Sequence, residues 1–264
     1  MCSPCGGNVQ MQEKIEHLQA VGRRTGLEVN RNKTKSLRIN AAQDTAILIE
    51  GEPIEDVPQF TYLGSEVSKT GGTEEDTRSR IGKARYAFIT LKPIWDNRVI
   101  HLRTKIRLFN TNVKTVLLYG SETWRRTKAL DKKLQVFINT SLRRILRIRW
   151  PERFSNQELW QRTNQRPIAE EIQMKKWRWI GHTIRRGQSC TARHSLDWNP
   201  QGSCRRGRPV QTWRRTLDSE LRKIQMSWGE AKQVAMDRTR WRAVVKALCP
   251  SRDEDDLVTK GFIP

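Results

Sequence analysis

The chain has 264 residues, of which 36% are hydrophobic and 30% are charged, and its formal net charge is +22. This length allows one large domain or two modest ones. So large a positive charge opposes compaction and indicates a polyanionic partner, RNA or DNA. Five widely spaced cysteines do not form the pattern of a disulfide framework. With no apolar run of about 18 residues and no secretory signal, we expect an intracellular protein, nuclear or cytoplasmic, without a membrane span.

The charge and the tryptophans divide the sequence into two parts. Residues 1–90 contain 12 Lys+Arg and 12 Asp+Glu, so the whole net charge of +22 lies in residues 91–264. All ten tryptophans lie there as well. We therefore expect a neutral N-terminal part and a basic, tryptophan-rich C-terminal part.

The N-terminal part predicts a helix followed by a small antiparallel sheet. Residues 1–8 are small and turn-forming and are expected to be frayed. Apolar residues recur at helical spacing between about Val9 and Arg24, and Gly26 ends this helix. Three short strands are expected at residues 37–40, 47–50 and 60–63.

Beyond residue 72 the sequence predicts helices. Thr73 and Asp76 resemble a capping box at the start of the first helix, which continues to about Trp95. Residues 187–207 are expected to form a long loop, and the acidic tail after Pro250 is expected to be disordered. Further helical patterns cover residues 102–116, 130–145, 155–161, 167–186, 209–226 and 229–248.

Two short blocks in the neutral part resemble the end of a reverse-transcriptase palm. The first is GLEVNRNKTK at residues 26–35, and the second is FTYLG at residues 60–64. Their order and spacing are similar to those in the enzymes of non-LTR (LINE-type) retrotransposons. The resemblance implies a helix and a short antiparallel sheet beside a polymerase site, and a parent activity of RNA-directed DNA synthesis with Mg²⁺.

The resemblance also implies roles for particular residues. Lys33, or alternatively Lys35, matches a lysine that acts as a general acid toward the departing pyrophosphate. The primer-grip hairpin, which holds the primer 3′ end, is matched by Phe60, Tyr62, Leu63 and Gly64. These residues also have an alternative interpretation that needs no polymerase. Lys33 would then be a solvated loop lysine, and Tyr62 and Leu63 would belong to the core of the sheet.

The helices that follow resemble the thumb of the same enzymes, in which one helix follows the minor groove of the template–primer duplex. The similarity lies in IGKAR at residues 81–85 and LLYGSETW at residues 117–124. Three further strings resemble parts of the C-terminal extensions of these elements, namely WIGH at 179–182, RGRP at 206–209 and DRTRWR at 237–242.

The catalytic carboxylates are where this chain departs from the family. Polymerisation needs carboxylates that converge on two metal ions, and in the family two adjacent aspartates precede the first block. Residues 1–26 contain no aspartate, and the pair Asp255–Asp256 lies in the acidic tail. We therefore expect a C-terminal fragment that is inactive alone and needs no cofactor. Its missing N-terminal part is a second partner to test.

These observations predict an α+β fold in four parts after the frayed N-terminus. They are a partial palm with a primer-grip-like hairpin at 9–72, a thumb-like helical region at 73–150, a basic helical extension at 151–250 and an acidic tail at 251–264. The expected function is binding of template–primer nucleic acid through the basic helical region. Two alternatives stay open, a non-enzymatic nucleic-acid-binding protein and a translated transposon relic without function.

Basic side chains of the thumb-like region and the extension are the expected contacts to phosphate. Arg206-Gly207-Arg208-Pro209 is also the core of an AT-hook, whose arginines enter a narrow minor groove, although a loop and helix start would use the same residues. The expected contacts are Lys83, Arg85, Arg143, Arg144, Arg147, Arg149, Lys175, Lys176, Arg178, Arg185, Arg186, Arg206 and Arg208.

Two further patterns have structural alternatives. Trp150 and Trp213 are flanked by arginines, which is typical of base stacking, yet each also suits an anchor in a small helical core. The second pattern is the set Cys190, His194, Cys204 and His182, which could be imagined as zinc ligands. No metal site is expected, because the spacing of these four residues matches no zinc knuckle.

Overall fold

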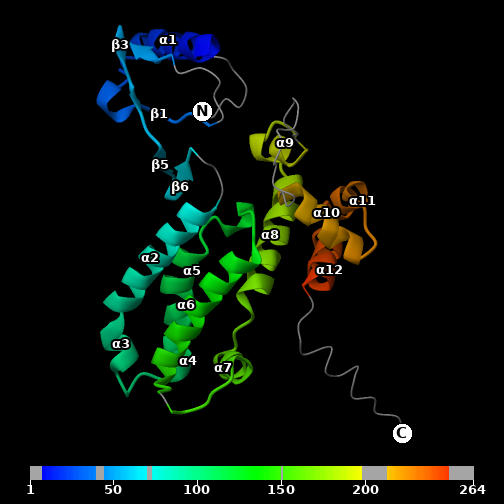
Figure 1. Ribbon diagram of the computed structural model, residues 1–264. Coiled ribbons are helices and arrows are strands. Elements are labelled where there is room, and N and C mark those ends of the chain that lie inside the picture. Colours follow the sequence, from blue (N-terminus) through cyan, green and yellow to red (C-terminus); the bar gives the residue numbers. More distant parts are fainter. Residues whose placement is uncertain (1–7, 40–44, 70–72, 150, 198–212, 250–264) are drawn as a thin grey trace. The chain divides into compact units, whose positions relative to one another are not determined.

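A computed structural model describes residues 8–39, 45–69, 73–149, 151–197 and 213–249 of the chain. The chain divides into two compact units, Met1–Asp76 and Thr77–Pro264. Short strand pairs lie in the first unit, and helices make up the second (Figure 1). The expected α+β class is therefore confirmed.

The first unit begins with helix α1, which spans Asn8–Arg24. Gly26 ends it in the left-handed region, with φ of +72°. The Leu27 N–H donates to the Gly22 carbonyl at 2.9 Å, and the Gly26 N–H donates to the Arg23 carbonyl at 3.3 Å. This pair of bonds is a Schellman motif, which explains why the helix stops where the glycine was expected to stop it.

Three two-stranded pairs follow α1. Strand β1 (Lys35–Ser36) pairs in parallel with β4 (Glu55–Asp56), and β2 (Leu48–Ile49) pairs antiparallel with β3 (Glu52–Pro53). The described part of the strand expected at 37–40, residues 37–39, is not a strand, because pairing ends at Ser36. The parallel pair corrects the expectation of a wholly antiparallel sheet. The core of this unit is small and consists of Ile47, Ile49 and Ile54, against which Met11, Ile15 and Val29 pack.

The third pair is the hairpin that the FTYLG block predicted. Strand β5 (Gln59–Tyr62) pairs antiparallel with β6 (Ser65–Ser68), and Tyr62 lies opposite Ser65. The two turn residues, Leu63 and Gly64, have φ of +48° and +82°, as a type I′ turn requires. The side chains of Tyr62 and Leu63 are 50% and 75% exposed, so the alternative that they form sheet core is wrong.

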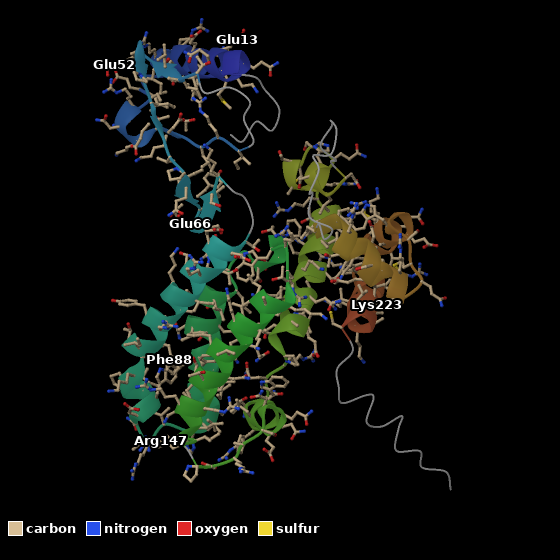
Figure 2. All side chains as sticks on the ribbon, viewed as in Figure 1. Glu13, Glu52, Glu66, Phe88, Arg147 and Lys223 are labelled. Carbon is tan, nitrogen blue, oxygen red and sulfur yellow. The ribbon has the colours of Figure 1, made fainter. Side chains whose placement is uncertain are left out.

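The second unit contains a first helical core built from α2 to the N-terminal half of α8. Leu134 and Leu142 of α6 and Phe109 of η2 are fully buried in it, and Phe88 stacks on Trp95 with 5.3 Å between ring centroids (Figure 2). The elements are α2 (Glu74–Thr90), α3 (Lys92–Asp96), α4 (Leu102–Leu108), the π-helix η2 (Phe109–Lys114), α5 (Thr115–Leu117), η3 (Ser121–Thr123), α6 (Lys128–Leu146), α7 (Asn156–Thr163) and α8 (Ile168–Ile184).

A second core forms on the C-terminal half of α8. Trp177 and Ile180 of α8 pack there against Leu217, Ala231 and Trp241, all of them buried. The partners of α8 are α9 (Thr191–Asp197), α10 (Trp213–Lys223), α11 (Trp228–Ala235) and α12 (Arg238–Leu248). Helix α8 thus contributes residues to both cores of this unit.

Three helical expectations need correction. The helix expected to continue to about Trp95 is two helices, since α2 ends at Thr90 and α3 begins at Lys92. The single helix expected at 229–248 is two helices, because the Asp237 side chain caps α12 by accepting hydrogen bonds from the backbone N–H groups of Thr239 and Arg240. The loop expected at 187–207 contains helix α9. Four tryptophans pack in the two helical cores, with Trp95, Trp177 and Trp241 buried and Trp160 half-buried.

Close packing of α8 on α12 depends on Gly181. A Cβ atom at this position would lie 2.0 Å from the Trp241 Nε1 atom. We expect Gly181→Ala to lower the free energy of unfolding by about 1–3 kcal/mol, because the buried indole has no room to move. Gly82→Ala on α2 is the matched control, since a Cβ there meets nothing within 4 Å. It should raise stability by about 0.5–1 kcal/mol. Urea denaturation measures both, and equal behaviour of the two variants would contradict the packing argument.

Candidate nucleic-acid interface

Six Arg or Lys residues line a groove between α8 and α12, called here the cationic groove. Its volume is about 710 Å³. No carboxylate lines it among the described residues, and the exposed guanidinium and ammonium groups of both helices do. The lining residues are Arg166, Met174, Arg178, His182, Arg185, Arg238, Trp241, Arg242, Val245, Lys246 and Cys249.

The cationic groove follows directly from helical periodicity. On α12, Arg238, Arg242 and Lys246 recur every fourth residue and so share one face, beside buried Trp241 and Val245. On α8, Arg178, His182 and Arg185 recur at spacings of four and three. Each helix therefore buries one apolar face in the second core and presents a row of basic side chains at its edge.

Positive charges crowd one another in this groove. Burial and the neighbouring Arg238 lower the pKa of the Arg185 guanidinium from its ordinary value. Arg185 also donates to the Ala235 carbonyl at 2.7 Å, which fixes its side chain. A bound anion would relieve this repulsion, so the arrangement favours a polyanionic ligand.

A second basic surface lies between α2 and α6 in the thumb-like region. It is a groove of about 730 Å³ with an apolar floor that includes Ile89 and Val136. Arg85 and Arg144, two of the expected contacts, line it together, and Lys83 is exposed on the same helix as Arg85. Lys132 and Lys133 complete the basic lining and were not singled out from the sequence.

The other basic residues near the end of α6 contact the protein itself. Arg143 is half-buried and donates to the Asn156 side chain at 2.7 Å and to the Phe154 carbonyl at 3.3 Å. Arg147 donates to the Asp96 carbonyl. Arg149 is exposed. These contacts hold the segments around α6 together, so Arg143 and Arg147 have structural partners besides any phosphate.

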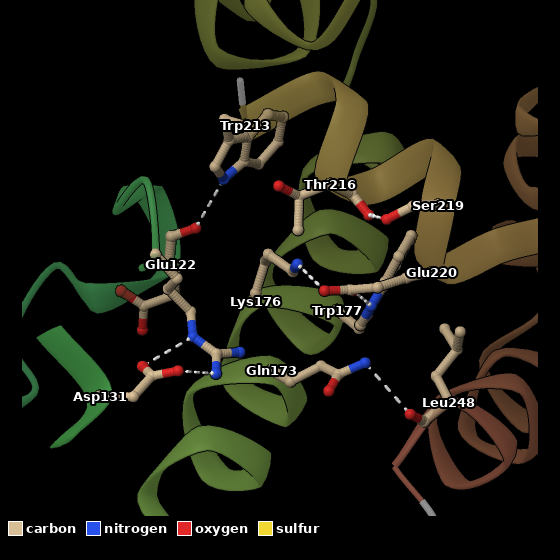
Figure 3. A network of polar contacts seen from close by, with 11 residues as sticks. Glu122, Asp131, Gln173, Lys176, Trp177, Trp213, Thr216, Ser219, Glu220 and Leu248 are labelled. Carbon is tan, nitrogen blue, oxygen red and sulfur yellow. Dashed lines mark hydrogen bonds and ion pairs between the residues drawn. The ribbon is translucent and has the colours of Figure 1, made fainter. Parts of the chain in front are cut away.

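Lys176 corrects the expected contact list. Its side chain is buried, and its Nζ lies 2.7 Å from the Glu220 carboxylate (Figure 3). The Trp177 Nε1 donates to the other oxygen of the same carboxylate at 2.6 Å. Burial is the largest cause that lowers the pKa of Lys176, although Glu220 opposes it. Lys176 faces the core and not a phosphate, whereas Lys175 is half-buried and Arg178 and Arg186 are exposed.

Trp213 has a structural role that favours its packing alternative. Its indole lies edge-on to Trp179, with 6.3 Å between ring centroids. Its Nε1 donates to the Glu122 carbonyl at 3.1 Å and so ties α10 to η3 (Figure 3). His182, named above in the set that matches no zinc knuckle, is exposed, lines the cationic groove and lies 3.4 Å from an Arg186 nitrogen.

The residues matched to the polymerase blocks lie in the first unit. Lys33 is exposed in the short helix η1 (Arg31–Lys33), which Asn30 caps. Lys35 pairs with Glu55 at 2.7 Å, so its charge is already balanced locally. The hairpin residues Phe60 and Tyr62 meet edge-on, with ring centroids 6.2 Å apart.

Within the described part of the chain, no three His, Cys, Asp or Glu side chains come close enough to hold a metal ion. Cys249 is buried, and burial raises the pKa of its thiol to about 11. Several of the residues singled out from the sequence lie outside the described ranges, namely Trp150, Cys204, Arg206, Arg208 and Asp255–Asp256.

We compared the chain with protein-family models, with curated proteins and with solved structures. A family model for a domain of unknown function, DUF6451, matches residues 87–119, which run from the end of α2 past α5. The chain is 25% identical over 259 residues to an uncharacterized transposon-derived protein of Caenorhabditis elegans, covering 92% of this chain and 90% of that protein. No solved structure matches.

The membrane expectation can be compared with the helices themselves. Within the described residues, none of the helices combines the length and the apolar character that crossing a bilayer requires.

The buried ion pair gives a stability prediction. Lys176→Ala should lower the free energy of unfolding by about 3–5 kcal/mol, because it leaves the Glu220 carboxylate buried without a counter-charge. Lys176→Met combined with Glu220→Gln should restore much of this loss, since the glutamine still accepts from Trp177 Nε1. Lys175→Ala, one residue away, should change stability by less than about 0.5 kcal/mol. Chemical denaturation measures all three, and a Lys175 variant as unstable as Lys176→Ala would refute the assignment.

Proposed function

We propose that this chain is a transposon-derived nucleic-acid-binding protein whose cationic groove holds the phosphate backbone of RNA or DNA. We further propose that it corresponds to the end of the palm, the thumb and the basic extension of a LINE-type reverse transcriptase. The single observation that carries the binding proposal is the cationic groove itself. Six Arg or Lys residues line it, and no carboxylate does among the described residues.

The size of the groove suits a nucleic-acid strand. Arg238 and Lys246 are eight residues apart on α12, so the row of cations spans about 12 Å along the helix. A strand in a duplex advances about 3.4 Å per phosphate. One row therefore faces about three or four phosphates, which is enough for several simultaneous ion pairs.

The groove is suited to the backbone and not to the bases. Trp241, the tryptophan among its described lining residues, is 3% exposed and donates through Nε1 to the Trp177 carbonyl at 3.0 Å. It is therefore packed and not free to stack on a base. Guanidinium groups at the rim bind phosphate oxygens and carry no direct sequence information. We expect binding that depends little on base sequence.

The thumb-like groove between α2 and α6 supports the family part of the proposal in a different way. Its Arg85 and Arg144 lie in the region where the resemblance implies a helix along the template–primer duplex. The similarity to a transposon-derived protein along nine-tenths of both chains agrees with such an origin. A non-enzymatic binding protein would use the same cationic groove, so this alternative shares the binding test.

Salt dependence tests the binding proposal. If six cations of the groove meet phosphates, affinity for a short RNA–DNA hybrid should fall about 10³-fold between about 50 and about 200 mM salt. Arg178→Gln combined with Arg242→Gln should weaken binding and reduce the slope of log K against log salt by about 2. Fluorescence anisotropy with labelled hybrids of two unrelated sequences measures affinity, slope and sequence dependence together.

Arg24→Gln combined with Arg162→Gln is the matched control, because it removes the same charge from exposed positions outside the groove. Its slope should stay close to that of the parent chain. Salt-insensitive binding, or an equal loss in both double variants, would overturn the groove assignment. A broad thermal transition together with no binding would instead favour the non-functional relic.

A further inference from the structure

We propose that the acidic segment Asp253–Asp256 of this same chain occupies the cationic groove between α8 and α12 and competes there with nucleic acid. The inference rests on the proposed function of that groove and adds its regulation by an internal occupant. It follows from the charge of the groove, from where α12 ends, and from the sequence that continues from it.

The groove ends at the point where the chain leaves it. Cys249 follows the last residue of α12, is 4% exposed and lines the groove, as does Lys246 one turn earlier. The Gln173 side chain of α8 donates to the Leu248 carbonyl at 3.2 Å, which fixes this end of α12 against α8 (Figure 3). Whatever follows Cys249 therefore starts at the groove itself.

The sequence that follows carries the charge that the groove lacks. Asp253-Glu254-Asp255-Asp256 is the longest acidic run in a chain whose net charge is +22. Its four carboxylates begin four residues after Cys249. Residues 250–264 lie outside the described ranges, so the argument uses only their sequence and their point of attachment.

The segment is long enough to reach every cation of the row on α12. At no more than about 3.6 Å per residue, Asp253 lies within about 14 Å of Cys249 and Asp256 within about 25 Å. The row from Lys246 to Arg238 extends about 12 Å along the helix. Attachment at the groove also gives the segment an effective concentration on the order of millimolar, far above that of a separate ligand.

Other surfaces and other occupants fit less well. The groove between α2 and α6 has an apolar floor, and a run of four carboxylates offers it nothing to bury. The cationic groove of a second copy would repel the first, since both are lined by like charges. The acidic run and the cationic groove complement each other in sign, with four carboxylates facing six lining cations.

Neutralising the acidic run tests the inference. The tail variant carries Asp253→Asn, Glu254→Gln, Asp255→Asn and Asp256→Asn. It should bind a labelled RNA–DNA hybrid about 3- to 10-fold more tightly than the parent chain at about 50 mM salt, because the internal competitor is removed. Its salt slope should be steeper, since nucleic acid then displaces counterions from the groove and not the tail.

A control variant separates local competition from overall charge. It carries the same number of neutral substitutions at exposed carboxylates that do not line the groove, namely Glu13→Gln, Glu16→Gln, Glu28→Gln and Glu152→Gln. Its affinity should stay near that of the parent chain. If the control tightens binding as much as the tail variant does, competition by the tail is overturned and overall charge explains the effect.

The failures of the two proposals can be told apart. If the parent chain and the tail variant bind equally well, the inference fails and the proposed function stands. If neither binds, the proposed function fails, and a nucleic-acid-free measurement still decides the inference. Amide ¹⁵N relaxation of Asp253–Asp256 should give order parameters above about 0.6 in the parent chain, falling below that value in the Arg178→Gln/Arg242→Gln variant. Equal, low values in both would overturn it.

Discussion

The packing of the second unit depends on a buried ion pair at the midpoint of α8. Ile168 and Ile172 of its first half lie in the first helical core, and Trp177 and Ile180 of its second half lie in the second. Between them, the buried Lys176 pairs with Glu220 of α10, which also accepts from Trp177. A buried ion pair of this kind is expensive to break from one side, because the remaining charge has no access to water. It therefore fixes the position of α10 on α8.

The cationic groove is a consequence of that same fixed packing. Once the core face of α8 is defined, Arg178, His182 and Arg185 must lie on its edge, and the close approach at Gly181 brings Trp241 and hence α12 alongside. Cations forced together in this way repel one another. Burial and then the neighbouring Arg238 lower the pKa of Arg185. The hydrophobic cores offset this repulsion, and a polyanion would remove it.

Helical periodicity made much of this predictable from the sequence, and long-range packing set the limits. The helices from α2 to α8 largely follow their apolar patterns, and the FTYLG block predicted a hairpin, although Leu63 lies in its turn and not in the strand expected at 60–63. The parallel pairing of β1 with β4 could not be predicted from the sequence, because it joins two strands of two residues each that are far apart in sequence. The boundary between α11 and α12 at Asp237 depends on a side-chain cap. The apolar pattern continues across this boundary, so periodicity alone does not predict it.

The candidate site shows the same limit at the level of single residues. Adjacency in sequence grouped Lys175, Lys176 and Arg178, yet the helix places Lys176 in the core. Spacing by three and four would have selected Arg178 and Arg185, and would have added the row on α12 that was not singled out. What no single-helix pattern supplies is that the two rows face one groove, since this depends on contacts between residues more than 50 positions apart.

The two units differ in whether their basic side chains are already paired with carboxylates. This difference favours the cationic groove as the place where a polyanionic ligand would bind. In the first unit, Arg23 pairs with Glu50, Lys35 with Glu55 and Arg38 with Asp56. A phosphate there would have to displace a carboxylate that is already in contact. The cationic groove has no carboxylate among its described lining residues and six Arg or Lys side chains around it, so a phosphate placed there is attracted by several cations at once. The polymerase-like blocks therefore bear on ancestry, and the basic helices bear on binding.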